Sequence, residues 1–377
     1  MNLTRFYRLI VFFFIAFSIC LFTSSCNNAS REKTIKIGAV LPLTGDVAAY
    51  GKDTKDGVDL AIAMANESQQ DKKFEVYYED SKGAPTTAVT ALQGLLAAQS
   101  PIAVVGENIS SSTAAMIPVC DRLHVLLLSP SASAPNLSGL SAYFFRVFPS
   151  DTEEGAFIAG VVAKQFPYSK VAIIYVNNDY GLGLKEIFNK NIQAQGLTIL
   201  PALSYEKGAK DFKTLLTKLK QDAPDAVYIP GYYEDAGLLL KQAKELGINT
   251  HFFGSTAEED PKLLAIAGSA AEGFQYPVST GYDADSKDST VSKFITRFKE
   301  KYNKVPGLVS ALGYDCGRLL TEGMIKNGIS ADSIRSYLLT SGTLSGAAGL
   351  MKFDSKGDVH KPILLKKVAN GLFTESN

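Results

Sequence analysis

Short runs of apolar, β-branched residues alternate along the chain with longer segments whose apolar residues recur at helical spacing. Apolar runs of this kind are typical of strands buried on both faces, and the intervening helices cover the two faces of a parallel sheet. The first part of the pattern therefore predicts a doubly wound α/β unit. Its expected strands cover residues 34–43, 74–81, 102–108 and 124–130, and its expected helices cover residues 56–67, 84–99 and 110–123.

The same alternation starts again after Asp151 and predicts a second α/β unit. Gly196 and Gly247 directly follow helical patterns, which is where a glycine commonly ends a helix. The expected helices of this unit cover residues 152–166, 181–196, 211–222 and 232–247, and its expected strands cover residues 170–178, 225–231 and 250–255.

The last third of the chain contains turns, two helices and a predicted hairpin. Turn-forming residues at 276–290 indicate a connection back to the first unit. Helical patterns follow at 289–302 and 313–328, and residues 349–371 have the pattern of a closing hairpin with its turn at 354–358. The chain thus returns to the first unit before it ends.

These connections divide the mature chain into two discontinuous lobes. The first lobe is predicted to contain residues 34–151 and 280–348. The second is predicted to contain residues 152–279 and 349–377. A chain of this length is long enough for two such domains.

The N-terminus has the pattern of an export signal. Arg5 and Arg8 precede the apolar stretch Leu9–Phe22, whose length of about 14 residues is below the ~20 that a membrane-spanning helix needs. Small residues before Cys26 are similar to a bacterial lipobox, although Thr23 stands where that motif prefers leucine. We predict a signal peptide at 1–25, acylation of Cys26 and a polar tether at 26–33, which anchors the exported protein to a membrane. A plain signal peptide is the alternative.

Composition and charge exclude some classes of protein. Lys+Arg and Asp+Glu both number 38, so the formal net charge is zero, and no basic stripe of the kind found in nucleic-acid-binding proteins is present. Of the four cysteines, Cys20 lies in the signal and Cys26 at the lipid site. Cys120 and Cys316 are expected as separate buried thiols, with a disulfide as the alternative.

Hydroxyl residues follow two neighbouring strands where each strand ends. Residues 110–113 are Ser, Ser, Ser and Thr at the start of a predicted helix, and Ser131 and Ser133 follow the next strand. Ligands of open α/β sheets bind beyond the carboxyl ends of the strands, and helix N-termini attract anions. The two loops are predicted to hold a carboxylate without an arginine. The alternative is that Ser110 or Ser111 only caps the helix.

Eight stretches resemble the type I periplasmic binding proteins, specifically the leucine/isoleucine/valine-binding branch that feeds ABC transporters. They keep their order and spacing over almost all of the mature chain: "IGAVLPLTGDVAAYG", "VVGENISSST", "LLSPSASAPNL", "FFRVFPSD", "VAIIYVNNDYGLGL", "PDAVYIPGYYEDAG", "FFGSTAEEDPKLL" and "FDSKGD". The resemblance implies two doubly wound parallel-sheet lobes joined by three crossovers, with a ligand trapped as the lobes close about a hinge. It implies a monomer that needs no cofactor and delivers its ligand to an ABC permease.

The resemblance also implies roles for individual residues. Ser110 and Ser133 would give hydroxyls to a ligand carboxylate, and Ser131 would contribute backbone groups. Tyr50 would pack its ring on the ligand. From the second lobe, Tyr180 and Tyr232 would close over the ligand, although half-buried packing is the alternative for each of these two tyrosines.

One position departs from the family pattern. Amino-acid binders of this branch place a carboxylate after "FFG" to pair with the ligand's ammonium, and Thr256 stands there in this chain. A buried ammonium without a carboxylate is costly. Either Glu258 or Glu259 swings in, or the ligand is another small carboxylate or amide without an ammonium. Both glutamates are more typical of the first turn of a helix.

The chain shows no pattern of catalytic residues. His124, His251 and His360 are scattered, and no nucleophile elbow, P-loop or zinc motif is present. Adjacent acids such as Glu153–Glu154 diverge on a helix and do not form a catalytic pair. A binding protein is therefore expected, with no metal. A sensor of the same fold without a transporter is the rival interpretation.

Overall fold

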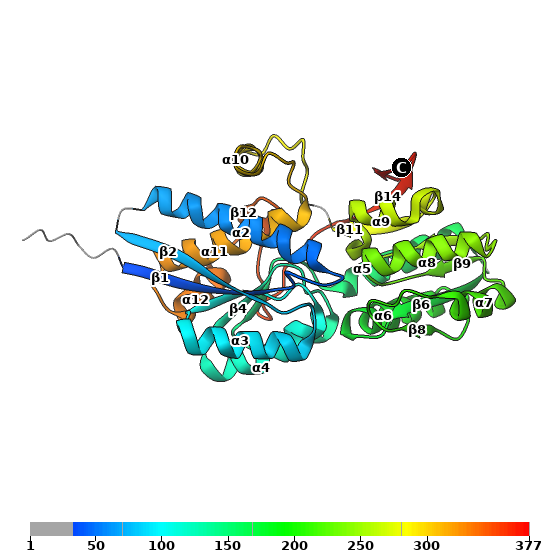
Figure 1. Ribbon diagram of the computed structural model, residues 1–377, viewed down its shortest axis with the longest axis horizontal. Coiled ribbons are helices and arrows are strands. Elements are labelled where there is room, and N and C mark those ends of the chain that lie inside the picture. Colours follow the sequence, from blue (N-terminus) through cyan, green and yellow to red (C-terminus); the bar gives the residue numbers. More distant parts are fainter. Residues whose placement is uncertain (1–32, 70, 168, 280, 377) are drawn as a thin grey trace, which may run out of the picture.

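The protein, described here from a computed structural model, forms two α/β lobes that lie end to end (Figure 1). The structure describes residues 33–69, 71–167, 169–279 and 281–376. The predicted signal peptide and Cys26 lie outside this part of the chain. Within it, no helix is both long enough and apolar enough to cross a bilayer.

The first lobe contains a five-stranded sheet in the order β2-β1-β3-β4-β5, and all of its strand pairs are parallel. This order is one of the two common doubly wound arrangements. The strands are β1 (Lys33–Leu41), β2 (Lys72–Asp80), β3 (Ala103–Gly106), β4 (Leu126–Ser129) and β5 (Phe144–Arg146).

Helices cover both faces of this sheet (Figure 1). One face packs against α2 (Ala48–Ser68), α10 (Ser289–Tyr302), α11 (Leu308–Lys326) and α12 (Ala331–Thr340), and the other packs against α3 (Pro85–Gln99) and α4 (Ser110–Leu123). Cys316 lies in the first of these cores and Cys120 in the second, and both are free buried thiols. The expectation of two separate thiols is confirmed.

The second lobe contains a sheet in the order β15-β14-β11-β10-β9-β6-β7, with β8 paired to β6. Its strand pairs are parallel from β11 to β7, whereas the β11–β14 and β14–β15 pairs are antiparallel. The strands are β6 (Lys170–Val176), β7 (Thr198–Ile199), β8 (Leu203–Tyr205), β9 (Ala226–Tyr228), β10 (His251–Phe253), β11 (Gln275–Ser279), β14 (Ile363–Ala369) and β15 (Leu372–Glu375). The helices are α5 (Asp151–Gln165), α6 (Asp179–Ala194), α7 (Lys213–Asp222), α8 (Tyr233–Glu245) and α9 (Pro261–Ala267).

Short elements complete the described structure. The strands β12 (Leu344–Gly346) and β13 (Gly349–Met351) form a separate antiparallel pair. The 3-10 helices are η1 (Pro135–Leu137), η2 (Thr256–Glu258) and η3 (Gly268–Ala271). Of these, η2 begins at the position where the family pattern places an acid.

The chain crosses between the lobes three times. It leaves the first lobe between β5 and α5, returns between β11 and α10, and leaves again before β14. The prediction placed residues 349–377 together in the second lobe. In the structure, Met351, Phe353 and Val359 are buried in the core of the first lobe, so the last crossover follows Val359.

The predicted closing hairpin at 349–371 is wrong in its pairing. The turn at 354–358 forms, with Asp354 and Asp358 joined by a backbone hydrogen bond of 2.9 Å, but only a single bridge between Phe353 and Val359 flanks it. The hairpin of this region is β14–β15. Asn370 and Gly371 form its turn with φ values of 54° and 70°, as a type I′ turn requires.

Candidate functional site

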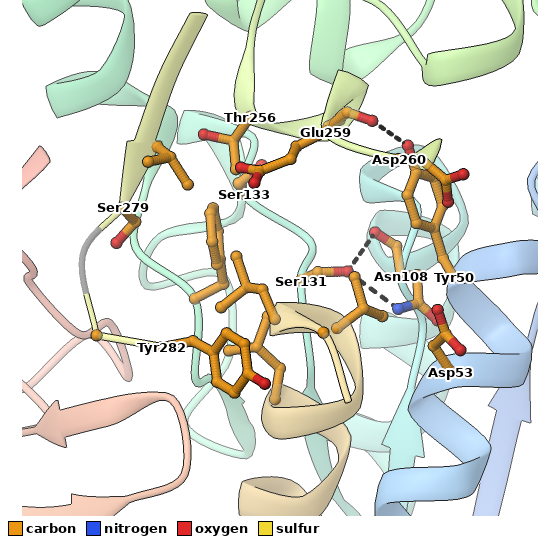
Figure 2. Close-up of a pocket in the computed structure, with 18 of the residues that line it drawn as sticks. Tyr50, Asp53, Asn108, Ser131, Ser133, Thr256, Glu259, Asp260, Ser279 and Tyr282 are labelled. Atoms are coloured by element: carbon orange, nitrogen blue, oxygen red, sulfur yellow. Dashed lines mark hydrogen bonds between the residues drawn. The ribbon is translucent and has the colours of Figure 1, made fainter. Parts of the chain in front are cut away.

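A cavity of about 610 Å³ lies between the two lobes, beyond the carboxyl ends of the parallel strands. Figure 2 shows Tyr50, Ser131, Ser133 and Thr256 around this space. All of the ligand-site residues predicted from the sequence line it: Tyr50, Ser110, Ser131, Ser133, Tyr180, Tyr232 and Thr256. The structure therefore brings residues from six separate segments of the chain to one place.

Ser110 does not cap the helix that it begins. The N-cap of α4 is Ile109, which has no side-chain capping bond, and the Ile109 amide donates to the buried Glu107 carboxylate. Ser110 Oγ instead accepts hydrogen bonds from the backbone amides of Ser133 at 3.2 Å and Ala134 at 3.1 Å. The capping alternative is thus wrong. Ser110 joins the two hydroxyl-bearing loops and leaves the N-terminus of α4 free of a capping side chain at the cavity.

Ser131 is held by Asn108, as the dashed lines of Figure 2 show. Asn108 Nδ2 donates to Ser131 Oγ at 3.0 Å and to Thr54 Oγ1 at 2.9 Å. Ser131 Oγ in turn donates to the carbonyl of Asn108 at 3.4 Å. Asn108 therefore ties the loops after β3 and β4 to helix α2.

The loop that carries Ser131 and Ser133 is supported from behind by Arg146, at the end of β5. The guanidinium is fully buried and donates to the carbonyls of Ala132 at 3.3 Å and Ala134 at 3.0 Å. It also donates to Asp358 at 2.7 Å. Arg146 is thus occupied by protein acceptors and does not line the cavity.

Three tyrosines form the opposite wall. Tyr180 and Tyr232 stack with their ring centroids 5.5 Å apart, and Tyr50 meets Tyr232 edge-on at 6.3 Å. The Tyr50 hydroxyl donates across the cleft to the carbonyl of Ala257. Because Tyr50 comes from the first lobe and the others from the second, this wall bridges the lobes.

Further contacts across the cleft show that the lobes are closed. The Tyr233 hydroxyl donates to the carbonyl of Asp46 at 2.9 Å, and Lys210 lies 3.4 Å from the Asp46 carboxylate. Asn136 Nδ2 donates to Asp179 Oδ1 at 2.9 Å. These contacts join the first lobe to the second outside the lining of the cavity.

Thr256 contacts a buried carboxylate that the sequence interpretation did not assign to the site. Its backbone amide donates to Glu154 Oε1 at 3.0 Å, and its hydroxyl lies 2.5 Å from Glu154 Oε2. Glu154 comes from the first turn of α5, is only 5% exposed and lines the cavity. Burial raises the pKa of Glu154 to about 7, and the bonds from Thr256 offset part of that rise.

Asp151 lies one turn before Glu154 on the same helix. Asp151 is 1% exposed, and neither of its carboxylate oxygens has a hydrogen-bond partner in the described part of the chain. Burial and the neighbouring Glu154 raise the pKa of Asp151, while the nearby Ser133 hydroxyl and the Arg146 guanidinium offset part of the rise. Two buried carboxyl groups therefore stand together without a cation between them.

The two glutamates after Thr256 are both engaged elsewhere. Glu258 is fully buried, and its carboxylate accepts hydrogen bonds from the amide and hydroxyl of Ser255 and from the Gly231 amide. Glu259 lines the cavity but pairs with Lys366 at 2.6 Å. Neither one replaces the acid missing at position 256.

The helical spacing of apolar residues along α5 is the signal that could have indicated Glu154, which the sequence analysis did not assign. The buried positions Asp151, Glu154, Gly155, Ile158, Ala159 and Val162 follow the spacing of one helix face. Glu153 and Glu154 do diverge, as predicted, with Glu153 exposed and paired with His360 at 2.8 Å. Two acids on an otherwise apolar helix face mark the functional side of this helix.

Acidic groups dominate the charged lining of the cavity. Among the described residues that line the cavity, Lys366 is the only basic one, and it is paired with Glu259. The acidic lining residues are Asp53, Glu154, Glu259, Asp260, Asp283 and Glu375. In the described part of the chain, no group of His, Cys, Asp and Glu is arranged to hold a metal ion.

Comparison with known proteins identifies the fold and its family. The sequence pattern of the family described as periplasmic binding protein matches residues 34–367. The chain belongs to this family. Within it, the chain is a type I member of the Leu/Ile/Val-binding branch, as predicted from the sequence. A Leu/Ile/Val/Thr/Ala-binding protein from Pseudomonas aeruginosa is 29% identical over 329 residues, which cover 86% of this chain and 87% of the relative.

Solved structures agree with this assignment. A leucine-binding protein from Thermotoga maritima superposes with a TM-score of 0.83 and 26% identity, over 91% of this chain and 98% of the other. A branched-chain amino acid binding protein from Streptococcus pneumoniae, solved with isoleucine, has a TM-score of 0.81 and 27% identity, over 90% and 98%. The periplasmic binding protein thus has the predicted fold and is a solute-binding protein of the type that serves ABC transporters.

Proposed function

We propose that this periplasmic binding protein captures a small ligand through its carboxylate, in the cavity between the lobes, and delivers it to an ABC permease. The observation that carries the proposal is the meeting of two hydroxyl-bearing loops with the uncapped N-terminus of α4 at that cavity. Relatives that bind leucine, isoleucine and valine support a branched-chain or similar amino acid. A carboxylate without an amino group is the alternative ligand.

The first-lobe wall offers neutral hydrogen-bond donors for an anion. The hydroxyls of Ser110 and Ser133 and the backbone groups of Ser131 are the proposed donors beside the start of α4, and no lysine or arginine stands among these residues. Backbone amides at a helix N-terminus and hydroxyl groups stabilise a carboxylate strongly where water is excluded. The ligand carboxylate is therefore placed against these serines.

Replacing Ser133 by alanine should weaken the binding of any such ligand by ~10-fold, which corresponds to the loss of one hydrogen bond to a charged group. Isothermal titration calorimetry measures this change. Ser111→Ala is the matched control, because Ser111 is on the same helix start but does not line the cavity. An unchanged affinity in Ser133→Ala would remove this hydroxyl from the site.

Replacing Tyr50 by phenylalanine should speed ligand release about 5-fold with little change in the association rate. The change deletes the hydroxyl bond to Ala257 that joins the lobes, and one such bond is worth ~1 kcal/mol. Stopped-flow kinetics measures both rates. Tyr302→Phe removes a comparable hydroxyl bond within the first lobe, to the Asp56 carbonyl, and should leave release unchanged. A slower association as the sole effect would contradict the role of Tyr50 in closure.

The protein is also proposed to be exported and held at a membrane. The basic and apolar N-terminal segment supports export, and Cys26 is the proposed lipid anchor to a membrane. The protein works as a monomer without turnover of its ligand. The rival interpretation is a sensor of the same fold that serves no transporter. A gene for an ABC permease beside the gene of this protein would favour transport, and its absence would favour the sensor.

A screen by thermal shift, followed by calorimetry, tests the proposal. The twenty standard L-amino acids are compared with the acids that lack their amino groups. At least one carboxylate from the two sets should raise the melting temperature and bind in the calorimeter. If no compound of either set raised the melting temperature or bound in the calorimeter, carboxylate capture would be contradicted.

A further inference from the structure

The cavity has one buried carboxylate without a protein cation. Asp53 pairs with Lys304 at 3.1 Å, and Glu259 pairs with Lys366. Asp260 accepts a hydrogen bond from the amide of Lys262, and it caps α9. Among the described acidic residues that line the cavity, only Glu154 is buried, and Thr256 is its sole hydrogen-bond partner in that part of the chain.

Asp151 gives a second, independent indication of a missing cation. It is 1% exposed, and among the described residues neither carboxylate oxygen has a hydrogen-bond partner. Burying one unpaired carboxyl group is costly, and burying a second one beside it is more costly still. Arg146, whose charge acts on Asp151, is already bound to Asp358 and to two carbonyls. A positive group supplied by the ligand would relieve both acids.

We infer that Glu154, with Asp151 behind it, receives the ammonium of the ligand, so that the site selects α-amino acids over acids without an amino group. This inference rests on the proposed function and names its substrate class. Glu154 reaches from α5 to the position of Thr256, where the family pattern has its own acid. The carboxylate is supplied by a different helix but reaches the same corner of the cleft.

The two ends of the proposed site are close enough for an α-amino acid. The backbone amide of Asp151 donates to the carbonyl of Ser133 at 2.8 Å, which places the start of α5 directly beside the hydroxyl loop. The carboxylate and ammonium of an α-amino acid are separated by a single carbon. A ligand held by Ser133 at one end therefore presents its ammonium to the first turn of α5.

The remaining wall suits an apolar side chain. The cavity lining also includes the apolar residues Phe148, Val278, Leu308, Val309 and Leu312. An apolar side chain of the ligand that packs on these residues is removed from water. Each buried methylene group of such a side chain contributes ~0.8 kcal/mol to the free energy of binding. The lining therefore favours an apolar amino acid.

The test compares Glu154→Gln with the wild type by calorimetry. The probes are the L-amino acid that gives the largest thermal shift in the screen and the acid that lacks its amino group. Wild type should bind the amino acid at least ~30-fold more tightly than the deaminated acid, and Glu154→Gln should lose most of that preference. The ratio of the two affinities is the readout, because a purely structural role would weaken both ligands alike.

Two further variants make the result specific. Glu153→Gln removes the adjacent exposed acid and should keep the wild-type ratio. Glu154→Gln combined with Thr256→Glu returns a carboxylate to the same contact from the other side, and it should recover at least part of the preference for the amino acid. Both variants are checked for folding by their melting temperatures.

The outcomes separate the inference from the proposed function. A protein that binds deaminated acids as tightly as amino acids overturns the inference and leaves carboxylate capture in place. An unchanged ratio in Glu154→Gln also overturns it. Failure to bind either set of probes overturns the proposed function itself.

Discussion

Replacing Arg146 by methionine should lower the free energy of unfolding by ~3–5 kcal/mol. The guanidinium is fully buried and bonds to Asp358, to the Ser138 hydroxyl and to the carbonyls of Ala132 and Ala134. Methionine fills a similar volume but leaves the buried Asp358 carboxylate without its partner. Removing one member of a buried ion pair costs far more than the pair itself contributes.

Urea unfolding measures this loss, and Arg297→Met is the control. Arg297 forms an ion pair with Glu67 at 2.6 Å on the surface of the same lobe. Exposed pairs contribute ~0–1 kcal/mol, so the control should change stability little. Equal effects of the two substitutions would contradict the structural role of Arg146. The Arg146 variant should also bind ligand more weakly, because the loop of Ser131 and Ser133 loses its support.

The stability of the ligand-free protein should depend on Glu154 between pH 5 and pH 8. The folded-state pKa of Glu154 is about 7, raised by burial above the ordinary value near 4.5. The folded protein therefore favours the protonated form of Glu154. The stability that this preference contributes is fully present below pH 4.5 and is lost as the pH rises through 7. The loss is on the order of 3 kcal/mol.

Glu154→Gln should remove this loss and make the ligand-free protein more stable than wild type at pH 8, with little difference at pH 4.5. Four titratable groups face Glu154: Asp151, Glu258, Tyr180 and Tyr228. The two acids among them, Asp151 and Glu258, repel an ionised Glu154 and so also favour its protonated form. Urea unfolding at the two pH values gives the difference, with Glu153→Gln as the control. A Glu154→Gln variant less stable than wild type at pH 8 would contradict the assignment of an uncompensated buried acid.

Much of the fold was predictable because its elements are long and regular. Buried apolar strands and helices with clear periodicity predicted both lobes. The elements that were missed include β5, β7 and β8, with at most three residues each, and also the ten-residue helix α12. The last crossover was misplaced because Phe353 and Val359 have an apolar pattern that either lobe accepts, and only the packing shows which core buries them.

Residues of the candidate site could be predicted where polar or aromatic residues follow the carboxyl end of a predicted parallel strand. The predicted serines and tyrosines line the cavity because the segments that carry them follow the parallel strands, whereas their contact with a ligand stays a prediction. Glu154 was missed because the family pattern directs attention to Thr256, and the two positions are 102 residues apart in the chain. Only the folded structure brings the acid of α5 to the loop after β10.

The crystal structure of the protein with the amino acid that it binds most tightly tests the central claim most directly. The decisive quantity is the distance from the ligand's ammonium nitrogen to the carboxylate of Glu154. Our account predicts ~3 Å, with the ligand carboxylate on Ser110, Ser133 and the start of α4. A ligand bound in the reverse orientation, or with its ammonium paired to another group and Glu154 uninvolved, would contradict it.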